Sequence, residues 1–127
     1  NIVTLALAIR GEYRAVFFVT VFRSFAAALA WGGLFSPSHI FSLSGGLLAA
    51  GMTILLCRYL SSLVSLVGVS VAAALAHGIG QLAAGHILFL TRDAVLAVLP
   101  LILLTAVATG ILVALVTKKV MARGWLV

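Results

Sequence analysis

Apolar residues in this chain form long runs that short polar groups interrupt. The apolar runs are Asn1–Ile9, Ala15–Leu34, Phe41–Leu60, Leu63–Ala83 and Ala94–Thr117. An α-helix rises about 1.5 Å per residue, so roughly 20 apolar residues cross the hydrocarbon core of a bilayer. The last four runs are long enough to span it, whereas the first covers about half a span. The pattern predicts an all-α, polytopic transmembrane helix bundle.

Composition agrees with this prediction. The chain has 127 residues, of which 65% are hydrophobic and 8% charged, and its mean hydropathy is +1.35. A soluble domain of this size needs a more polar surface, so we expect a single membrane domain over residues 1–127. We interpret the net charge of +6 as a topology signal, and it gives no reason to expect nucleic acid as a partner. The single cysteine, Cys57, excludes an internal disulfide.

Basic residues are distributed unevenly between the two sides of the predicted bundle. Those of one side are Arg10, Arg14, Arg58, Lys118, Lys119 and Arg123. The alternate loops contain Arg92 as their one basic residue. The positive-inside rule therefore predicts a cytoplasmic C-terminus. Asn1 then lies toward the outer side, and one further helix before it would give six spans. Because the chain also starts without Met, we expect the natural protein to have residues upstream.

Small residues recur at every fourth position in two of the predicted helices. They are Gly68, Ala72, Ala76, Gly80 and Ala84 in one helix, and Ala106, Gly110 and Ala114 in the other. Such stripes let helix backbones approach closely in lipid, and we favour bundle packing over a partner surface as their role. Pro100, near the start of the last run, predicts a kink or a local break.

Two polar side chains stand within the uncharged run Leu63–Ala83. His77 and Gln81 are four residues apart and therefore share one face of a helix. Inside a bilayer each needs a partner, and the predicted topology places both in the outer half. Hydrogen bonding between helices is one interpretation. Because Gly78 and Gly80 remove bulk beside them, we favour an outward-facing substrate-binding site.

Arg23 lies inside the second run, roughly 12 Å along the helix from its cytoplasmic end. An arginine at that depth needs a counter-charge or carbonyl partners. The two acids of the chain, Glu12 and Asp93, are both in loops. We therefore expect Arg23 to bind an anionic group such as a carboxylate or phosphate. The alternative is pairing with Glu12, a terminal carbonyl or a lipid headgroup.

The sequence SLSGG, which ends at Gly46, lies at the outer end of the third run. Hydroxyls and glycines at a helix start can present backbone N–H groups to an anion, although a serine there can also simply cap the helix. The segment falls at the same membrane level as Gln81. We therefore expect Ser44, Gly45 and Gly46 to belong to the same substrate site, with Ser36–His39 able to cover it.

The chain lacks the residue patterns of soluble-type catalysis. It has no paired carboxylates, no acidic motif for magnesium-diphosphate chemistry, no Walker loop and no CxxC pair. Three histidines without neighbouring acids or cysteines do not form the pattern of a metal site. We expect no catalytic residues, metal or cofactor, and so a protein that is not an enzyme on its own.

Four stretches resemble a family of small bacterial membrane proteins labelled "Gx transporter" or "heptaprenyl diphosphate synthase component I". They are NIVTLALAI, LFSPSHIFSLSGGLLA, GVSVAAALAHGIGQLAAG and VATGILVALV. That family is similar to the substrate-binding S components of energy-coupling-factor (ECF) vitamin transporters. The resemblance implies a six-helix fold in the bacterial cytoplasmic membrane, with a substrate pocket in the outer half. It also implies partners, namely a transmembrane T component and two cytoplasmic ATPases.

The function we expect is the binding of a small vitamin- or precursor-like molecule for uptake by such a transporter. An alternative is a non-catalytic membrane subunit of isoprenoid, heptaprenyl diphosphate or quinone metabolism, which predicts an apolar groove open to lipid. Isoprenyl chain elongation itself requires magnesium-binding acids, which the two acids of this chain do not supply. A purely structural scaffold is a further alternative. It predicts that His77, Gln81 and Arg23 each bond to neighbouring helices and leave no cavity.

Overall fold

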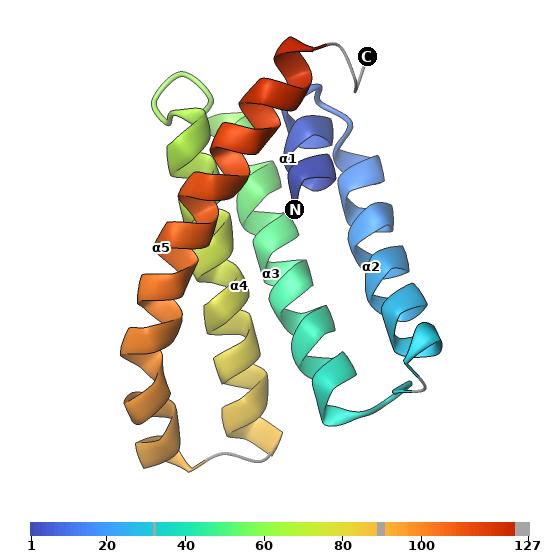
Figure 1. The fold of residues 1–127 in the computed structure, drawn as a ribbon, viewed down its shortest axis with the longest axis vertical. Coiled ribbons are helices and arrows are strands. Elements are labelled where there is room, and N and C mark those ends of the chain that lie inside the picture. Colours follow the sequence, from blue (N-terminus) through green and yellow to red (C-terminus); the bar gives the residue numbers. More distant parts are fainter. Residues whose placement is uncertain (32, 89–90, 124–127) are drawn as a thin grey trace.

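The protein is a bundle of helices. A computed structural model describes residues 1–31, 33–88 and 91–123. Its helices are α1 (Ile2–Ile9), α2 (Tyr13–Ala30), α3 (Pro37–Tyr59), α4 (Leu66–Leu88) and α5 (Arg92–Ala122) (Figure 1). Within the described ranges the fold has no strand, which confirms the all-α prediction. Each predicted apolar run corresponds to one helix, and α2, α3, α4 and α5 extend beyond the runs that predicted them.

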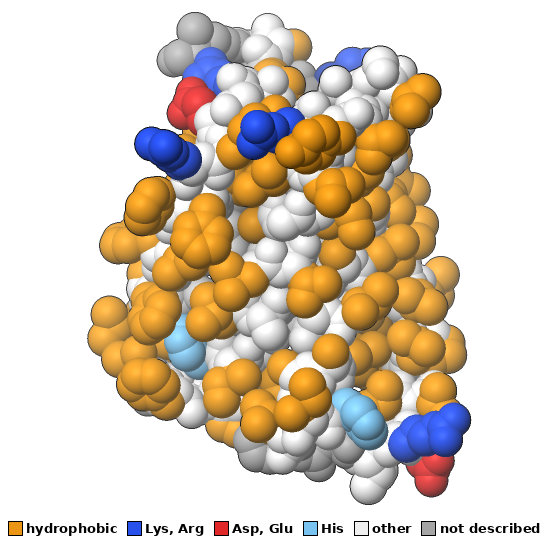
Figure 2. All heavy atoms as spheres, turned by 180° about the vertical axis from the view of Figure 1, so that it is seen from behind, with side chains coloured by type: hydrophobic (Ala, Val, Ile, Leu, Met, Phe, Trp, Pro, Cys, Tyr) orange, Lys and Arg blue, Asp and Glu red, His pale blue; other side chains and the backbone are white. Residues whose placement is uncertain are grey.

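Four of the described helices, α2 to α5, are long and apolar enough to cross a membrane. They run side by side along the length of the bundle, while the shorter α1 starts near mid-height and packs against α2, α3 and α5 (Figure 1). On the face shown in Figure 2, hydrophobic side chains cover much of the surface, and the visible Lys and Arg side chains lie near its two ends. A belt of apolar side chains between charged ends is the surface expected of a membrane protein.

Hydroxyl side chains mark where two of the spans begin. The Ser36 Oγ accepts a hydrogen bond from the His39 backbone N–H at 3.2 Å, and Pro37 occupies the first turn of α3. The Thr91 Oγ1 accepts one from the Ala94 N–H at 3.4 Å at the start of α5. Of the kink or local break predicted at Pro100, the break is wrong, because α5 runs through this residue as one helix. A proline removes a single N–H donor, and neighbouring helices can hold the remaining turns in place.

Helices α3 and α4 meet backbone to backbone. A Cβ atom on Gly80 would lie 2.9 Å from the Ser44 carbonyl oxygen and 3.0 Å from the Gly45 Cα. A Cβ on Gly45 would lie 2.7 Å from the His77 carbonyl oxygen. Real Cβ atoms do not come this close to backbone atoms, so only glycine fits at either position. The mutual contact of the two glycines fixes the separation and register of the two helices.

Helices α4 and α5 use the second small-residue stripe. Ala106, Gly110 and Ala114 are all buried, and a Cβ on Gly110 would lie 2.6 Å from the Val71 Cα. The packing role predicted for the stripes is therefore confirmed at both interfaces. Because lipid competes for apolar side chains as well as a neighbouring helix does, close backbone contact is a main source of bundle stability.

We predict that Gly80→Ala destabilises the bundle, because the added methyl must push α3 and α4 apart. The expected loss is about 1–3 kcal/mol in the free energy of unfolding, typical of overpacking. Gly51→Ala is the matched control, since Gly51 is also helical but has open space at its Cβ position. This control should be neutral or gain about 0.5–1 kcal/mol from helix propensity. Unfolding of the purified protein in detergent measures both, and equal stability of the two variants would contradict the packing.

Candidate functional site

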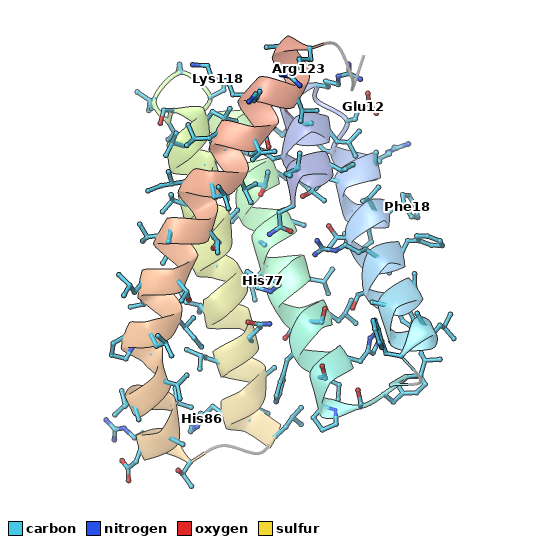
Figure 3. All side chains as sticks on the ribbon, viewed as in Figure 1. Glu12, Phe18, His77, His86, Lys118 and Arg123 are labelled. Carbon is cyan, nitrogen blue, oxygen red and sulfur yellow. The ribbon has the colours of Figure 1, made fainter. Side chains whose placement is uncertain are left out.

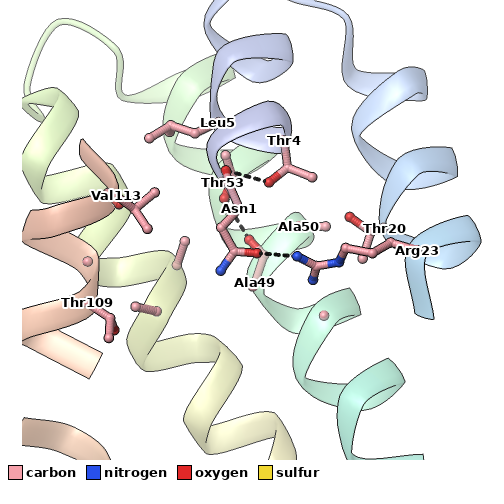
Figure 4. A pocket seen from close by; sticks show the side chains of 15 residues that line it. Asn1, Thr4, Leu5, Thr20, Arg23, Ala49, Ala50, Thr53, Thr109 and Val113 are labelled. Carbon is pink, nitrogen blue, oxygen red and sulfur yellow. Dashed lines mark hydrogen bonds between the residues drawn. The ribbon is translucent and has the colours of Figure 1, made fainter. Parts of the chain in front are cut away.

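A cavity lies inside the bundle where all the helices meet (Figure 4). Its volume is about 50 Å³, room for a few water molecules or a small polar group. The residues around it are Asn1, Thr4, Leu5, Thr20, Arg23, Gly46, Ala49, Ala50, Thr53, Ser70, Ala73, Ala74, Thr109, Gly110 and Val113. We call it the interior cavity. It exists because glycine and alanine form much of its wall, and it is partly polar because hydroxyls and one guanidinium line it.

Arg23 supplies the charge of the interior cavity. Its Nη1 donates a hydrogen bond to the Asn1 side-chain Oδ1 at 3.1 Å (Figure 4). This partner is a neutral amide oxygen, so the contact does not neutralise the guanidinium. A guanidinium carries five N–H donors, and this bond uses one of them. Glu12, the acid considered as its partner from the sequence, lies near one end of the bundle (Figure 3), and it does not line the cavity.

The threonines of the cavity use their hydroxyl protons within their own helices. Thr20 Oγ1 donates to the Val16 carbonyl oxygen and Thr53 Oγ1 to that of Ala49, each at 2.8 Å. Thr4 and Thr109 do the same toward the carbonyl oxygens of residues 1 and 105. A hydroxyl has one proton and two lone pairs, so these side chains keep acceptor capacity after bonding. The interior cavity therefore combines threonine acceptors with the donors of Arg23.

Four of the residues predicted for the site come together elsewhere, at the contact between α3 and α4. The Gly45 Cβ position lies 2.8 Å from the Gln81 Cγ and 3.0 Å from the His77 Cε1. Ser44 Oγ donates toward the Phe41 carbonyl oxygen at 3.1 Å and, across the interface, toward that of Gly80 at 3.2 Å. These residues were expected at one membrane level, and in the structure they touch each other. The contact between them is one of helix packing.

The His77 ring is a further polar group of this contact. His77 lies on α4 at mid-span (Figure 3), and its Nδ1 is buried with no hydrogen-bond partner among the described residues. Gly46 follows Gly45 but faces the other way, since its Cβ position is 3.1 Å from the Thr20 Cγ2 and it lines the interior cavity. The structure therefore divides the six predicted residues. Arg23 and Gly46 are at the cavity, and His77, Gln81, Ser44 and Gly45 form the α3–α4 contact.

One expectation about the glycines is wrong. We expected Gly45 and Gly46 near a helix start, where free backbone N–H groups can hold an anion. Helix α3 begins at Pro37 and is capped by Ser36, so both glycines lie inside the helix. Backbone N–H groups there are bonded within the helix and are not free for a ligand. The glycines act by letting other groups approach, at α4 for Gly45 and at the cavity for Gly46.

None of the hydroxyl side chains around the cavity was predicted from the sequence. Threonine and serine occur singly in the apolar runs and look compatible with lipid, because each can bond to its own helix. The available signal was their depth. Thr20 and Arg23 are neighbours on one face of α2, and Thr53, Ser70 and Thr109 lie within spans. Among the described residues, no group of three His, Cys, Asp or Glu side chains could hold a metal ion.

Together the fold and the interior cavity define an α-helical membrane protein with a polar interior. The chain belongs to the heptaprenyl diphosphate synthase component I family, whose family model matches residues 1–120. No curated protein and no solved structure matches it. The family name is that of one component of a synthase, and it implies a partner component in a complex.

We predict that Ser44→Ala weakens the α3–α4 contact, because its hydroxyl is the one that reaches across to the Gly80 carbonyl. Interhelical hydrogen bonds in membranes contribute about 0.6–2 kcal/mol, so the free energy of unfolding should fall by that amount. Ser62→Ala, at an exposed serine between α3 and α4, is the control and should leave stability unchanged. If both variants unfold alike, the hydroxyl does not join the helices.

Proposed function

We propose that this protein is a membrane-embedded substrate-binding subunit, of the S-component type, of an ECF uptake transporter for a small vitamin- or precursor-like molecule. The observation that carries the proposal is the interior cavity with the Arg23 guanidinium, whose bonded partner is a neutral amide. The Arg23 side chain is exposed and also lines the cavity. A charged side chain at membrane depth is costly, and where it occurs it usually faces a ligand or ion pathway. A scaffold without a ligand would have no need for such a cavity.

The chemistry of the cavity describes the ligand. Arg23 calls for an acceptor such as a carboxylate, phosphate or carbonyl oxygen. The threonines call for N–H or O–H donors, because their own protons are used within their helices. The ligand we propose therefore carries both kinds of group. Given a volume of about 50 Å³, the group that enters is small, and a larger molecule would extend beyond the cavity.

His77 and Gln81 have a place in this proposal beside the cavity. They pack on Gly45, the residue before the cavity-lining Gly46, so the α3–α4 contact adjoins the cavity wall. We propose that the His77 ring and the Gln81 amide hydrogen-bond the part of the ligand outside the cavity, with Ser44 and Gly45 shaping that wall. The unpartnered His77 Nδ1 supports this assignment, because a buried ring nitrogen is stabilised by a hydrogen bond that a ligand can supply.

The proposal extends to location and partners. By the positive-inside rule, the end carrying Arg10, Arg58 and Lys118 faces the cytoplasm of a bacterium, together with the C-terminus. The partners are a transmembrane T component and two cytoplasmic ATPases, since this chain carries no nucleotide-binding pattern of its own. The protein binds and delivers its substrate and does no chemistry on it.

A second candidate function has one specific observation in its favour. An apolar groove of about 480 Å³ runs between α1 and α2, lined by Val3, Phe18, Val19 and Phe22, and it reaches Asn1, Thr4 and Arg23. Phe18 points away from the bundle, as a lipid-facing side chain does (Figure 3). Such a groove suits an isoprenoid or quinone tail. It supports a non-catalytic subunit that serves isoprenoid metabolism, in keeping with the name of the family.

Ligand-induced stabilisation tests both candidates. Purified protein in nanodiscs is screened by thermal shift against water-soluble vitamins and quinone or isoprenoid precursors. For a vitamin-like hit we expect Arg23→Gln, His77→Ala and Gln81→Ala each to weaken affinity at least about tenfold, equivalent to 1.4 kcal/mol. Arg14→Gln, at an arginine of the same helix that does not line the interior cavity, is the control and should bind normally.

The outcomes separate the candidates. If soluble hits keep their affinity in all three variants, the proposed binding residues are wrong. If only long-tailed compounds stabilise the protein, and Phe22→Ala weakens them, the groove function replaces the transport function.

A further inference from the structure

A second polar pocket lies between the last turns of α2 and the first turns of α3, away from the interior cavity. Its volume is about 340 Å³. Its polar lining consists of Ser24, Ser36, Ser38, His39 and Ser42, and its apolar lining of Ala27, Ala28, Trp31 and Gly33. We call it the α2–α3 pocket. None of its polar residues lines the interior cavity, and none belongs to the α3–α4 contact.

Two polar side chains of the α2–α3 pocket are buried and unpartnered. Ser24 is 5% exposed and His39 is 6% exposed. The Ser24 Oγ and the His39 Nδ1 have no hydrogen-bond partner among the described residues. The His39 ring is held in place edge-on by Phe25, with the ring centroids 5.0 Å apart. Buried polar atoms are nearly always bonded, so two orphans in one pocket point to a partner that joins them there.

The pocket also contains the start of α3, a helix of 23 residues. The first backbone N–H groups of a helix lack helical partners, and the helix dipole places partial positive charge at this end. Here Ser36 Oγ already accepts the His39 N–H, and the Ile40 N–H bonds to the Ser36 carbonyl oxygen. Pro37 has no N–H. The Ser38 N–H is therefore the first-turn donor without such a bond. The partial positive charge of the helix dipole also lies at this end.

No carboxylate lines this pocket, and its polar side chains can act as hydrogen-bond donors. The hydroxyls of Ser24, Ser38 and Ser42 can each donate, and so can the His39 ring. Trp31, 88% exposed beside the pocket, is placed as interfacial aromatic residues are in membrane proteins. We propose that the α2–α3 pocket binds a phosphate oxyanion, held by serine hydroxyls, His39 and the N-terminus of α3.

Such a phosphate can come from a lipid headgroup or from a free phosphorylated compound. Both present the same oxygens, so the test uses two probes on protein purified in dodecyl maltoside, a detergent without phosphate. The probes are inorganic phosphate and short-chain phosphatidylglycerol, with chloride at the same ionic strength as the blank. We expect one or both to raise the melting temperature of the wild-type protein in a saturable way. Saturation by phosphatidylglycerol alone identifies the source as lipid.

The variant Ser24→Ala distinguishes loss of phosphate binding from loss of folding. Without probe, the variant should melt at or above the wild-type temperature, because an unpaired buried hydroxyl has been removed. With probe, the concentration that gives half of the maximal stabilisation should be at least about tenfold higher than for the wild type. His39→Phe keeps the ring against Phe25 but removes both nitrogens, and it should lose the response as well. Ser62→Ala, remote from the pocket, should respond like the wild type.

Two results would overturn the proposal. One is a wild-type protein that neither probe stabilises beyond the chloride blank. The other is a response that Ser24→Ala and His39→Phe both retain. Because the interior cavity shares no residue with this pocket, Arg23→Gln should keep the phosphate response, and this outcome separates the two sites.

Discussion

The rest of the structure depends on the backbone contact between α3 and α4. At Gly45 and Gly80 the helices are so close that a single methyl group would collide with the opposite backbone. In lipid no hydrophobic force drives the helices together, so such close approach, with the Ser44 hydroxyl bonded across it, holds the pair. This contact sets the register that brings His77 and Gln81 against Gly45. It also directs the adjacent Gly46 into the bundle interior.

The interior cavity follows from the same use of small residues. Where Gly45 and Gly80 touch, no space remains, and where Gly46, Ala49 and Ala73 face several helices at once, a space opens. The threonine hydroxyls around it are bonded to carbonyl oxygens of their own helices, so they are stable in an apolar bundle without a ligand. Arg23 has no such internal solution, because it carries a full charge and its bonded partner is neutral. The proposed binding function therefore depends on this group above all.

The sequence predicted much of this fold for a clear physical reason. Hydrophobic length and the spacing of small residues are one-dimensional signals, and they gave the spans and the stripes containing Gly80 and Gly110. Depth along a helix is also readable, which is why His77 and Gly45 were placed at one level. The sequence does not show which face of a helix turns toward which neighbour. The separation of Arg23 from His77 was therefore not predicted. The cap at Ser36 was missed because the apolar run begins only after it, and the expected anion site at Gly45 and Gly46 was an error for that reason.

Whether the interior cavity holds a ligand through Arg23 can be measured directly by native mass spectrometry. The protein is released from nanodiscs made with the membranes of its expression host, as wild type, Arg23→Gln and Arg14→Gln. We predict a small bound molecule in the wild type and in Arg14→Gln, and its loss in Arg23→Gln. A bound species retained equally in all three proteins, or bare protein mass in all three, would contradict the assignment of the cavity as a binding site.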